Sequence, residues 1–372
     1  MKENSIKKSF VSNKDIITHY CASLFLYGLA LAFIYFNPWC INILKNNFNI
    51  SLRHCFVILY TLYIILAPVF FFIKRPISIL NSKNVIILDY LKRILIKRTD
   101  YTPDENELQA ISLYFLRLFF IPLSAGMTLT FLKMFMNVYN DGYLLYQDIT
   151  VNASKYTNIN DSLIIAAFRN CTFSLLLFGF YFASAILYFI SYIFYGDVKN
   201  TDTTTLGIVS CLCCYIPFKN VLDRFIIPYP ERIREFSIGS PDGFFTWLFY
   251  ILAFITIIMC ICGLFSLMLK SSNLTNRGTI TRFPFNIIRH PMYSGRIILW
   301  WIFIISIIVT IPENMQISAH LSKVSGAIVY GIFYTIIYTL RAISEERNLL
   351  TNNDDYKQYS THTKYRFIPY VW

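Results

Sequence analysis

Long apolar segments alternate with short polar ones along most of this 372-residue chain. A helix needs about 20 mostly apolar residues to cross the roughly 30 Å of bilayer hydrocarbon. Seven segments meet that length: 19–36, 54–73, 109–136, 163–194, 244–269, 292–311 and 321–343. An eighth, 205–218, is apolar but short for a span. The pattern predicts an all-α polytopic membrane bundle of about eight transmembrane helices.

Basic residues between the apolar segments predict how the chain is oriented. Loops rich in Lys and Arg tend to stay in the cytoplasm. The N-terminus and the linker after the second span are rich in Lys and Arg, whereas 141–161 contains only Lys155 as a cation among three aspartates. The loop 270–289 and the tail after Arg341 are also basic. They are cytoplasmic only if 205–218 crosses as well, which favours eight spans.

Composition supports a membrane protein, with 56% apolar and only 15% charged residues. The mean hydropathy is +0.50. The net charge of +12 is divided among the loops, so it indicates topology and no nucleic-acid partner. Eight of the nine cysteines lie in or beside apolar segments, which is not a disulfide framework. The cluster Cys211, Cys213 and Cys214 has no neighbouring His and no second Cys pair, so no metal site is predicted.

Two features divide the chain. In residues 83–98 the apolar positions recur at helical spacing beside a charged side, which predicts an amphipathic helix on an anionic leaflet. A solvated connector is the alternative.

The polar, Pro-containing stretch 229–243 places the main boundary near residue 240. We therefore expect an N-terminal membrane region, 1–240, with about five spans, and a C-terminal region, 241–372, for the chemistry.

The most informative motif is Arg289-His290-Pro291-Met292-Tyr293-Ser294-Gly295, just before an apolar segment. Proline suits the first position of a helix, which makes His290 the expected N-cap. The free N–H groups and positive dipole end of that helix would face the same polar space as Arg289 and favour an anion such as a carboxylate. Helical spacing also puts Arg296 on the same face as Tyr293.

A second group of candidate site residues lies at the end of the last apolar segment. Tyr338, Arg341 and Glu345 fall on one helical face, and Glu346 adds a second carboxylate. An ordinary solvated helix end is the alternative explanation. Carboxylates near a helix C-terminus are mildly unfavourable with the dipole, however, which favours a ligand-binding role.

These motifs resemble the integral-membrane methyltransferases typified by isoprenylcysteine carboxyl methyltransferase, with the phospholipid methyltransferases as relatives. The resemblance covers about the last third of the chain. It rests on Gly278, Arg289 to Gly295, an apolar hairpin, Glu345-Glu346-Arg347-Asn348-Leu349-Leu350, and then Tyr356, Tyr359 and Pro369. Asn352-Asn353-Asp354-Asp355 departs from the aromatic-glycine pair that usually precedes the tyrosine.

The resemblance implies that S-adenosylmethionine binds at the cytoplasmic face. It implies contacts from His290 and Tyr293, with Glu345 or Glu346 holding ribose hydroxyls or the amino group. Arg289 would hold the methionine carboxylate or the acceptor carboxylate, and both assignments stay open. The set of expected catalytic and cofactor-binding residues is completed by Arg296, Arg341, Tyr356 and Tyr359, the two tyrosines closing the tail over the adenosine.

The expected acceptor is a lipophilic membrane substrate, most simply an isoprenylcysteine-type carboxylate, because a carboxylate needs no base. A phospholipid amine acceptor would require His290 or Glu346 as the base. Sterol reductases that use NADPH share the Arg-His-Pro element and a tail similar to 364–370. This sequence, however, offers few of the basic side chains that the 2′-phosphate of that nucleotide would need. A non-catalytic membrane scaffold or transport protein is the remaining alternative.

Overall fold

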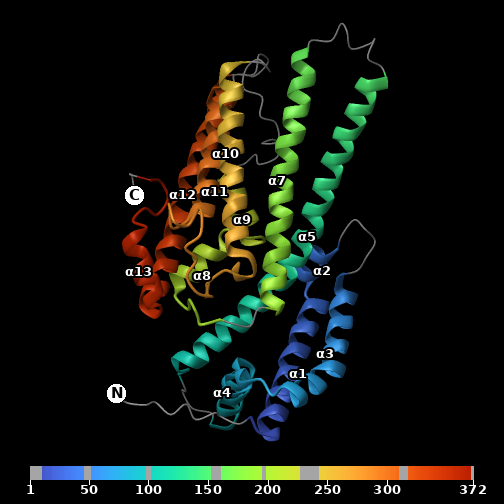
Figure 1. Ribbon diagram of the computed structural model, residues 1–372, viewed down its shortest axis with the longest axis vertical. Helices are drawn as coiled ribbons and strands as arrows, with labels where there is room; N and C mark the ends of the chain where they lie inside the picture. The colour runs from blue at the N-terminus through green and yellow to red at the C-terminus, as the bar shows by residue number, and fades with distance from the viewer. Residues whose placement is uncertain are drawn as a thin grey trace. The chain divides into compact units, whose positions relative to one another are not determined.

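The computed structural model describes residues 11–45, 52–97, 102–151, 161–194, 198–226, 243–309 and 317–369, which are mostly helical (Figure 1). Seven helices are long and apolar enough to cross a membrane. They are α1 (Asn13–Phe36), α3 (Leu52–Lys74), α5 (Glu105–Val151), α7 (Asp161–Phe194), α10 (Phe244–Leu267), α11 (Pro291–Val309) and α12 (Ile317–Asn352). The predicted all-α polytopic membrane bundle is confirmed.

Two compact units make up the chain, Met1–Met127 and Thr128–Trp372. The first contains α1, α2 (Pro38–Leu44), α3, η1 (Ile77–Asn81), α4 (Lys83–Lys97) and the start of α5. The α4 helix is the predicted amphipathic helix, and its Arg93 pairs with the buried Glu107 of α5. Its location on a leaflet stays a prediction. The predicted boundary near residue 240 lies outside the described residues.

In the second unit, α10 packs between α7 and α11, and α12 packs on the other side of α11. Phe173 of α7, Ile257 of α10 and Leu299 of α11 belong to one buried apolar cluster. The α11 and α12 helices form the predicted apolar hairpin. The α12 helix extends past the predicted end at 343 through two glutamates and an arginine, because these residues are good helix formers. The α5 helix likewise continues beyond 136.

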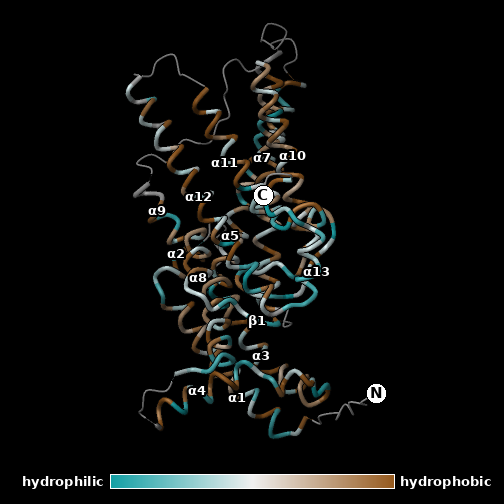
Figure 2. The backbone as a smooth tube through the Cα atoms, turned by 90° about the vertical axis from the view of Figure 1, so that its left-hand side faces the viewer, coloured by the Kyte–Doolittle hydropathy of each residue, from teal (hydrophilic) through white to brown (hydrophobic). Residues whose placement is uncertain are grey.

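Four helix ends meet at one face of this unit. Strand β1 (Asn200–Thr201) follows α7 and pairs antiparallel with β2 (Thr275–Asn276), which follows α10, so both helices end at the same face. The α11 helix begins there, and α12 ends there beside the short helix α13 (Asp354–His362). Figure 2 shows hydrophilic segments gathered around α13.

The segment 205–218 does not form the continuous spanning helix that eight helical spans would require. This segment contains α8 (Thr205–Leu212), whose eight residues reach only about 12 Å, and it reaches the start of α9 (Phe218–Ile226). The segment nevertheless follows α12 in the opposite direction. Thr204 lies beside Ser344, and the Lys219 ammonium donates to the Tyr330 hydroxyl at 2.9 Å. Ser344 and Tyr330 are about 21 Å apart along α12, so the segment runs away from the face where the four helix ends meet.

Candidate active site

The start of α11 has the predicted cap. Pro291 is the first helical residue, and the Ser294 amide donates to the His290 carbonyl at 2.9 Å, so His290 is the N-cap. The amides of Arg289 and His290 are not free, however, because they donate to the carbonyls of Tyr365 and Arg366 at 2.9 and 3.0 Å. The C-terminal tail is therefore bound by the two residues that directly precede the helix.

Glu346 joins three parts of the chain at this helix start. Its carboxylate accepts hydrogen bonds from Arg289 Nη1 at 3.1 Å and Arg366 Nε at 2.9 Å, and lies 3.0 Å from His290 Nε2. The side chain is only 2% exposed. Both oxygens are thus engaged within the protein, and Glu346 ties α12 to the start of α11 and to the tail. We call this set the Glu346 clasp.

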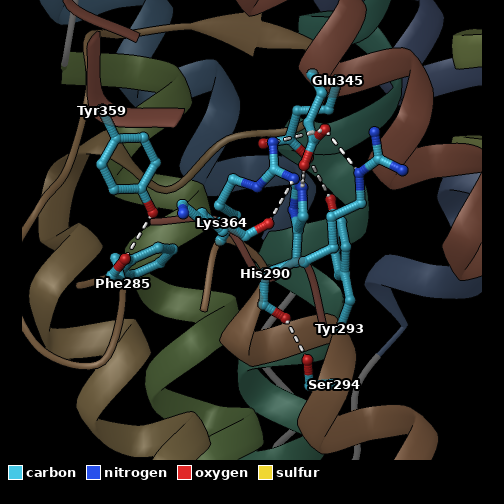
Figure 3. Close-up of polar contacts among 10 residues, drawn as sticks. Phe285, His290, Tyr293, Ser294, Glu345, Tyr359 and Lys364 are labelled. Carbon is cyan, nitrogen blue, oxygen red and sulfur yellow. Dashed lines mark hydrogen bonds and ion pairs between the residues drawn. The ribbon is translucent and has the colours of Figure 1, made fainter. Parts of the chain in front are cut away.

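Glu345, the preceding residue, has a different environment. Its carboxylate accepts a hydrogen bond from the Tyr293 hydroxyl at 2.8 Å (Figure 3). The Tyr293 ring stacks on His290 with centroids 5.3 Å apart. Because consecutive helical residues point about 100° apart, Glu345 faces the adjoining cavity while Glu346 faces the tail.

This cavity lies at the face where the helix ends meet, has a volume of about 110 Å³ and opens to solvent. All four predicted catalytic residues line it, as do Arg341 and Glu345 of the predicted cofactor set. The lining cations are Lys270, Arg277, Arg289, Arg296 and Arg341. Among the described residues around the cavity, Glu345 is the one carboxylate.

Two of the cations reach the cavity from within the bundle. Arg296 Nη1 donates to the Tyr338 hydroxyl at 3.2 Å. Arg341 is 4% exposed, and its guanidinium lies over the rings of Tyr293 and Tyr215, at 5.1 and 5.6 Å from the centroids. The Nη1 atom of Arg341 is buried without a hydrogen-bond partner in the described part of the chain. Buried cations in a membrane helix usually mark a ligand site, because an unpaired charge there is costly.

The sequence did not identify Asn273 as a site residue. Its side-chain oxygen accepts from Arg341 Nη2 and from the Tyr215 hydroxyl, the latter at 3.0 Å, so it orients the arginine. The only available signal was the polar stretch 271–276 between apolar segments. That stretch gives no indication of a contact with a residue 68 positions away.

Three predicted cofactor residues do not line this cavity: Glu346, Tyr356 and Tyr359. The Tyr359 hydroxyl donates to the Phe285 carbonyl at 2.6 Å (Figure 3). Burial raises the pKa of Tyr359 to about 12. Tyr356 is buried beside it, with ring centroids 5.4 Å apart. Tyr359 thus attaches α13 to the loop before α11, and Phe285 of that loop does line the cavity.

The arrangement offers one carboxylate, several cations and aromatic rings in a cavity at the end of apolar helices. It can hold a polar ligand of mixed charge next to a hydrophobic one. Comparisons with protein-family models, curated proteins and solved structures gave no match.

Proposed function

We propose that this protein is an integral membrane methyltransferase that uses S-adenosylmethionine and methylates a lipophilic acceptor bearing a carboxylate. The observation that carries the proposal is that one cavity is lined by both the Glu345 carboxylate and Arg341, whose buried Nη1 has no hydrogen-bond partner among the described residues. The sequence resemblance supports the same assignment, because both residues lie on the helix that carries its paired glutamates.

The residues of the cavity fit the charges of S-adenosylmethionine. The carboxylate of its methionine end would accept a charge-assisted hydrogen bond from the unpartnered Nη1 of Arg341. Glu345, already oriented by the Tyr293 hydroxyl, would accept from the amino group or from ribose hydroxyls. When bound, the cofactor supplies an electrophilic methyl group.

An acceptor carboxylate would be held by Arg296, which lies one helical turn further into the bundle than Tyr293. Held there, the acceptor carboxylate would take the methyl group that the cofactor supplies, with a new carbon–oxygen bond replacing the carbon–sulfur bond and a neutral thioether as the leaving group. No proton moves in this step. The part of the protein in this step is to align donor and acceptor.

An amine acceptor is less compatible with this geometry. It must lose a proton to a base, and the two candidates for that role are His290 and Glu346. Both belong to the Glu346 clasp, where they lie 3.0 Å apart, and the His290 ring is stacked on Tyr293. O-methylation is therefore favoured over N-methylation.

We also propose that the cavity faces the cytoplasm. The segments at its face carry a concentration of basic residues, whereas 141–161, at the other end of α7, contains Lys155 as its single Lys or Arg. Loops with excess Lys and Arg are retained on the cytoplasmic side. The basic residues are Lys199, Lys270, Arg277, Arg282, Arg289, Lys357, Lys364 and Arg366.

The test is calorimetric titration of the purified protein with S-adenosylmethionine and with NADPH. We expect S-adenosylmethionine to bind, and Glu345→Gln and Arg341→Gln each to weaken it by about tenfold or more, the equivalent of one charge-assisted hydrogen bond. Arg347→Gln, on an exposed side of the same helix, is the matched control and should bind normally. Transfer of a labelled methyl group into extracted membrane lipids would then identify the acceptor. Binding of NADPH without S-adenosylmethionine would refute the proposal.

One observation favours a second candidate, an NADPH-dependent reductase of the sterol reductase kind. The sequence had suggested too few basic side chains for a phosphorylated nucleotide. The cavity is instead lined by Lys270 and four arginines. Such an excess of positive charge suits phosphate groups. The same titration separates the two functions.

A further inference from the structure

The N-terminal unit contains a cavity of its own, formed by α1, α4 and the beginning of α5. Its volume is about 70 Å³, within about 500 Å³ of open space that includes the exterior of the protein. Most of its wall is apolar, including Ile34 of α1, Ile87 of α4, and Leu118 and Ile121 of α5. Apolar walls of this extent favour a hydrocarbon chain over a water-soluble ligand.

Several polar side chains at this cavity are already satisfied. The Asn84 amide donates to the Ser23 hydroxyl at 2.8 Å, and the Tyr114 hydroxyl donates to the Leu26 carbonyl at 2.9 Å. These bonds hold α4 and α5 against α1. The helices that form the cavity walls are thus joined to one another. The cavity also contains two charged side chains.

The two charged groups are Lys83, at the start of α4, and Arg117, within the spanning helix α5. Among the described lining residues there is no carboxylate to neutralise them. Glu107, the buried carboxylate of this unit, is paired with Arg93. The Nε atom of Arg117 is buried and has no hydrogen-bond partner within the described residues. A guanidinium in apolar surroundings is costly unless an anion joins it.

We propose that this cavity binds an anionic phospholipid, with its phosphate between Lys83 and Arg117 and an acyl chain along Ile34, Leu118 and Ile121. Charge complementarity selects the headgroup, because a phosphate has enough acceptor oxygens to bind two cations at once. The apolar wall selects the chain. This lipid site belongs to the N-terminal unit and does not depend on the function proposed for the C-terminal unit.

Native mass spectrometry of the full chain in detergent tests the site, with phosphatidylglycerol and phosphatidylcholine of identical acyl chains as probes. The wild type should retain phosphatidylglycerol with about a tenfold preference, as expected for one charge-assisted contact. Arg117→Gln and Lys83→Gln should each remove most of that preference. Lys92→Gln is the matched control, because Lys92 lies on α4 with a side chain 57% exposed and pairs with Asp89. It should behave as wild type.

A second variant separates a lipid site from a general effect of charge. Ala30→Phe would fill the cavity from α1 and leave both cations in place, and we expect it to abolish retention of phosphatidylglycerol. Lys83→Gln keeps the test valid if Arg117→Gln does not fold, because Lys83 is partly exposed. Equal retention of the two lipids by the wild type would overturn the proposal. Full retention in Arg117→Gln, or displacement of the phospholipid by equimolar oleate, would also overturn it.

Discussion

Replacing Glu346 by Gln should release the tail from the start of α11 and leave the bundle folded. The carboxylate is 2% exposed and meets three donors at 2.9 to 3.1 Å. A hydrogen bond to a charged group contributes about 1.5–3 kcal/mol, and breaking a buried ion pair costs about 3–5 kcal/mol. Because the Arg289 and Arg366 side chains are 12% and 27% exposed, solvent recovers part of the loss. We expect tail docking to weaken by about 3 kcal/mol.

Limited trypsin digestion measures this loss, because Lys364 and Arg366 lie in the docked tail. When closing is fast, the cleavage rate follows the open population, so about 3 kcal/mol predicts roughly a hundredfold acceleration. The matched control is Glu345→Gln, which neutralises the adjacent residue but leaves the Glu346 clasp intact. Its rate should stay within about twofold of wild type. Equal acceleration in both variants, or none in Glu346→Gln, would refute the assignment of separate roles to the two glutamates.

Two further predictions concern packing and pH. A Cβ on Gly295 would collide with the Cys260 sulfur of α10, so Gly295→Ala should lower the melting temperature, at a cost of about 1–3 kcal/mol, whereas Gly326→Ala, with open space around it, should not. A result in the reverse order would contradict this packing. Burial raises the pKa of Tyr359 to about 12, above its ordinary value of about 10. Tail docking should therefore keep its full strength below pH of about 10 and weaken as the pH rises toward 12. The difference in tyrosinate absorbance between wild type and Tyr359→Phe measures the ionisation of Tyr359. A transition at the ordinary pKa of tyrosine would contradict the burial of its hydroxyl.

Part of the candidate site followed from local sequence rules. Pro291 fixes the start of α11, which is why His290 was correctly placed as the N-cap. Helical spacing correctly put Arg341 and Glu345 on one face of a continuous helix. The different surroundings of Glu345 and Glu346 could not be predicted from the sequence, because they depend on how α12 is rotated about its axis. That rotation is set by packing of residues such as Tyr334 in the core.

The sequence by itself determined the class of fold and the seven long helices, since spanning a bilayer depends on the length and polarity of one continuous segment. Only the tertiary structure decided that 205–218 contains no spanning helix, that the tail occupies the amides before α11, and that Asn273 orients Arg341. The last two are contacts between residues more than 60 positions apart in the chain. Such contacts arise from how helices pack against each other, and no local pattern of hydrophobic and polar residues encodes them.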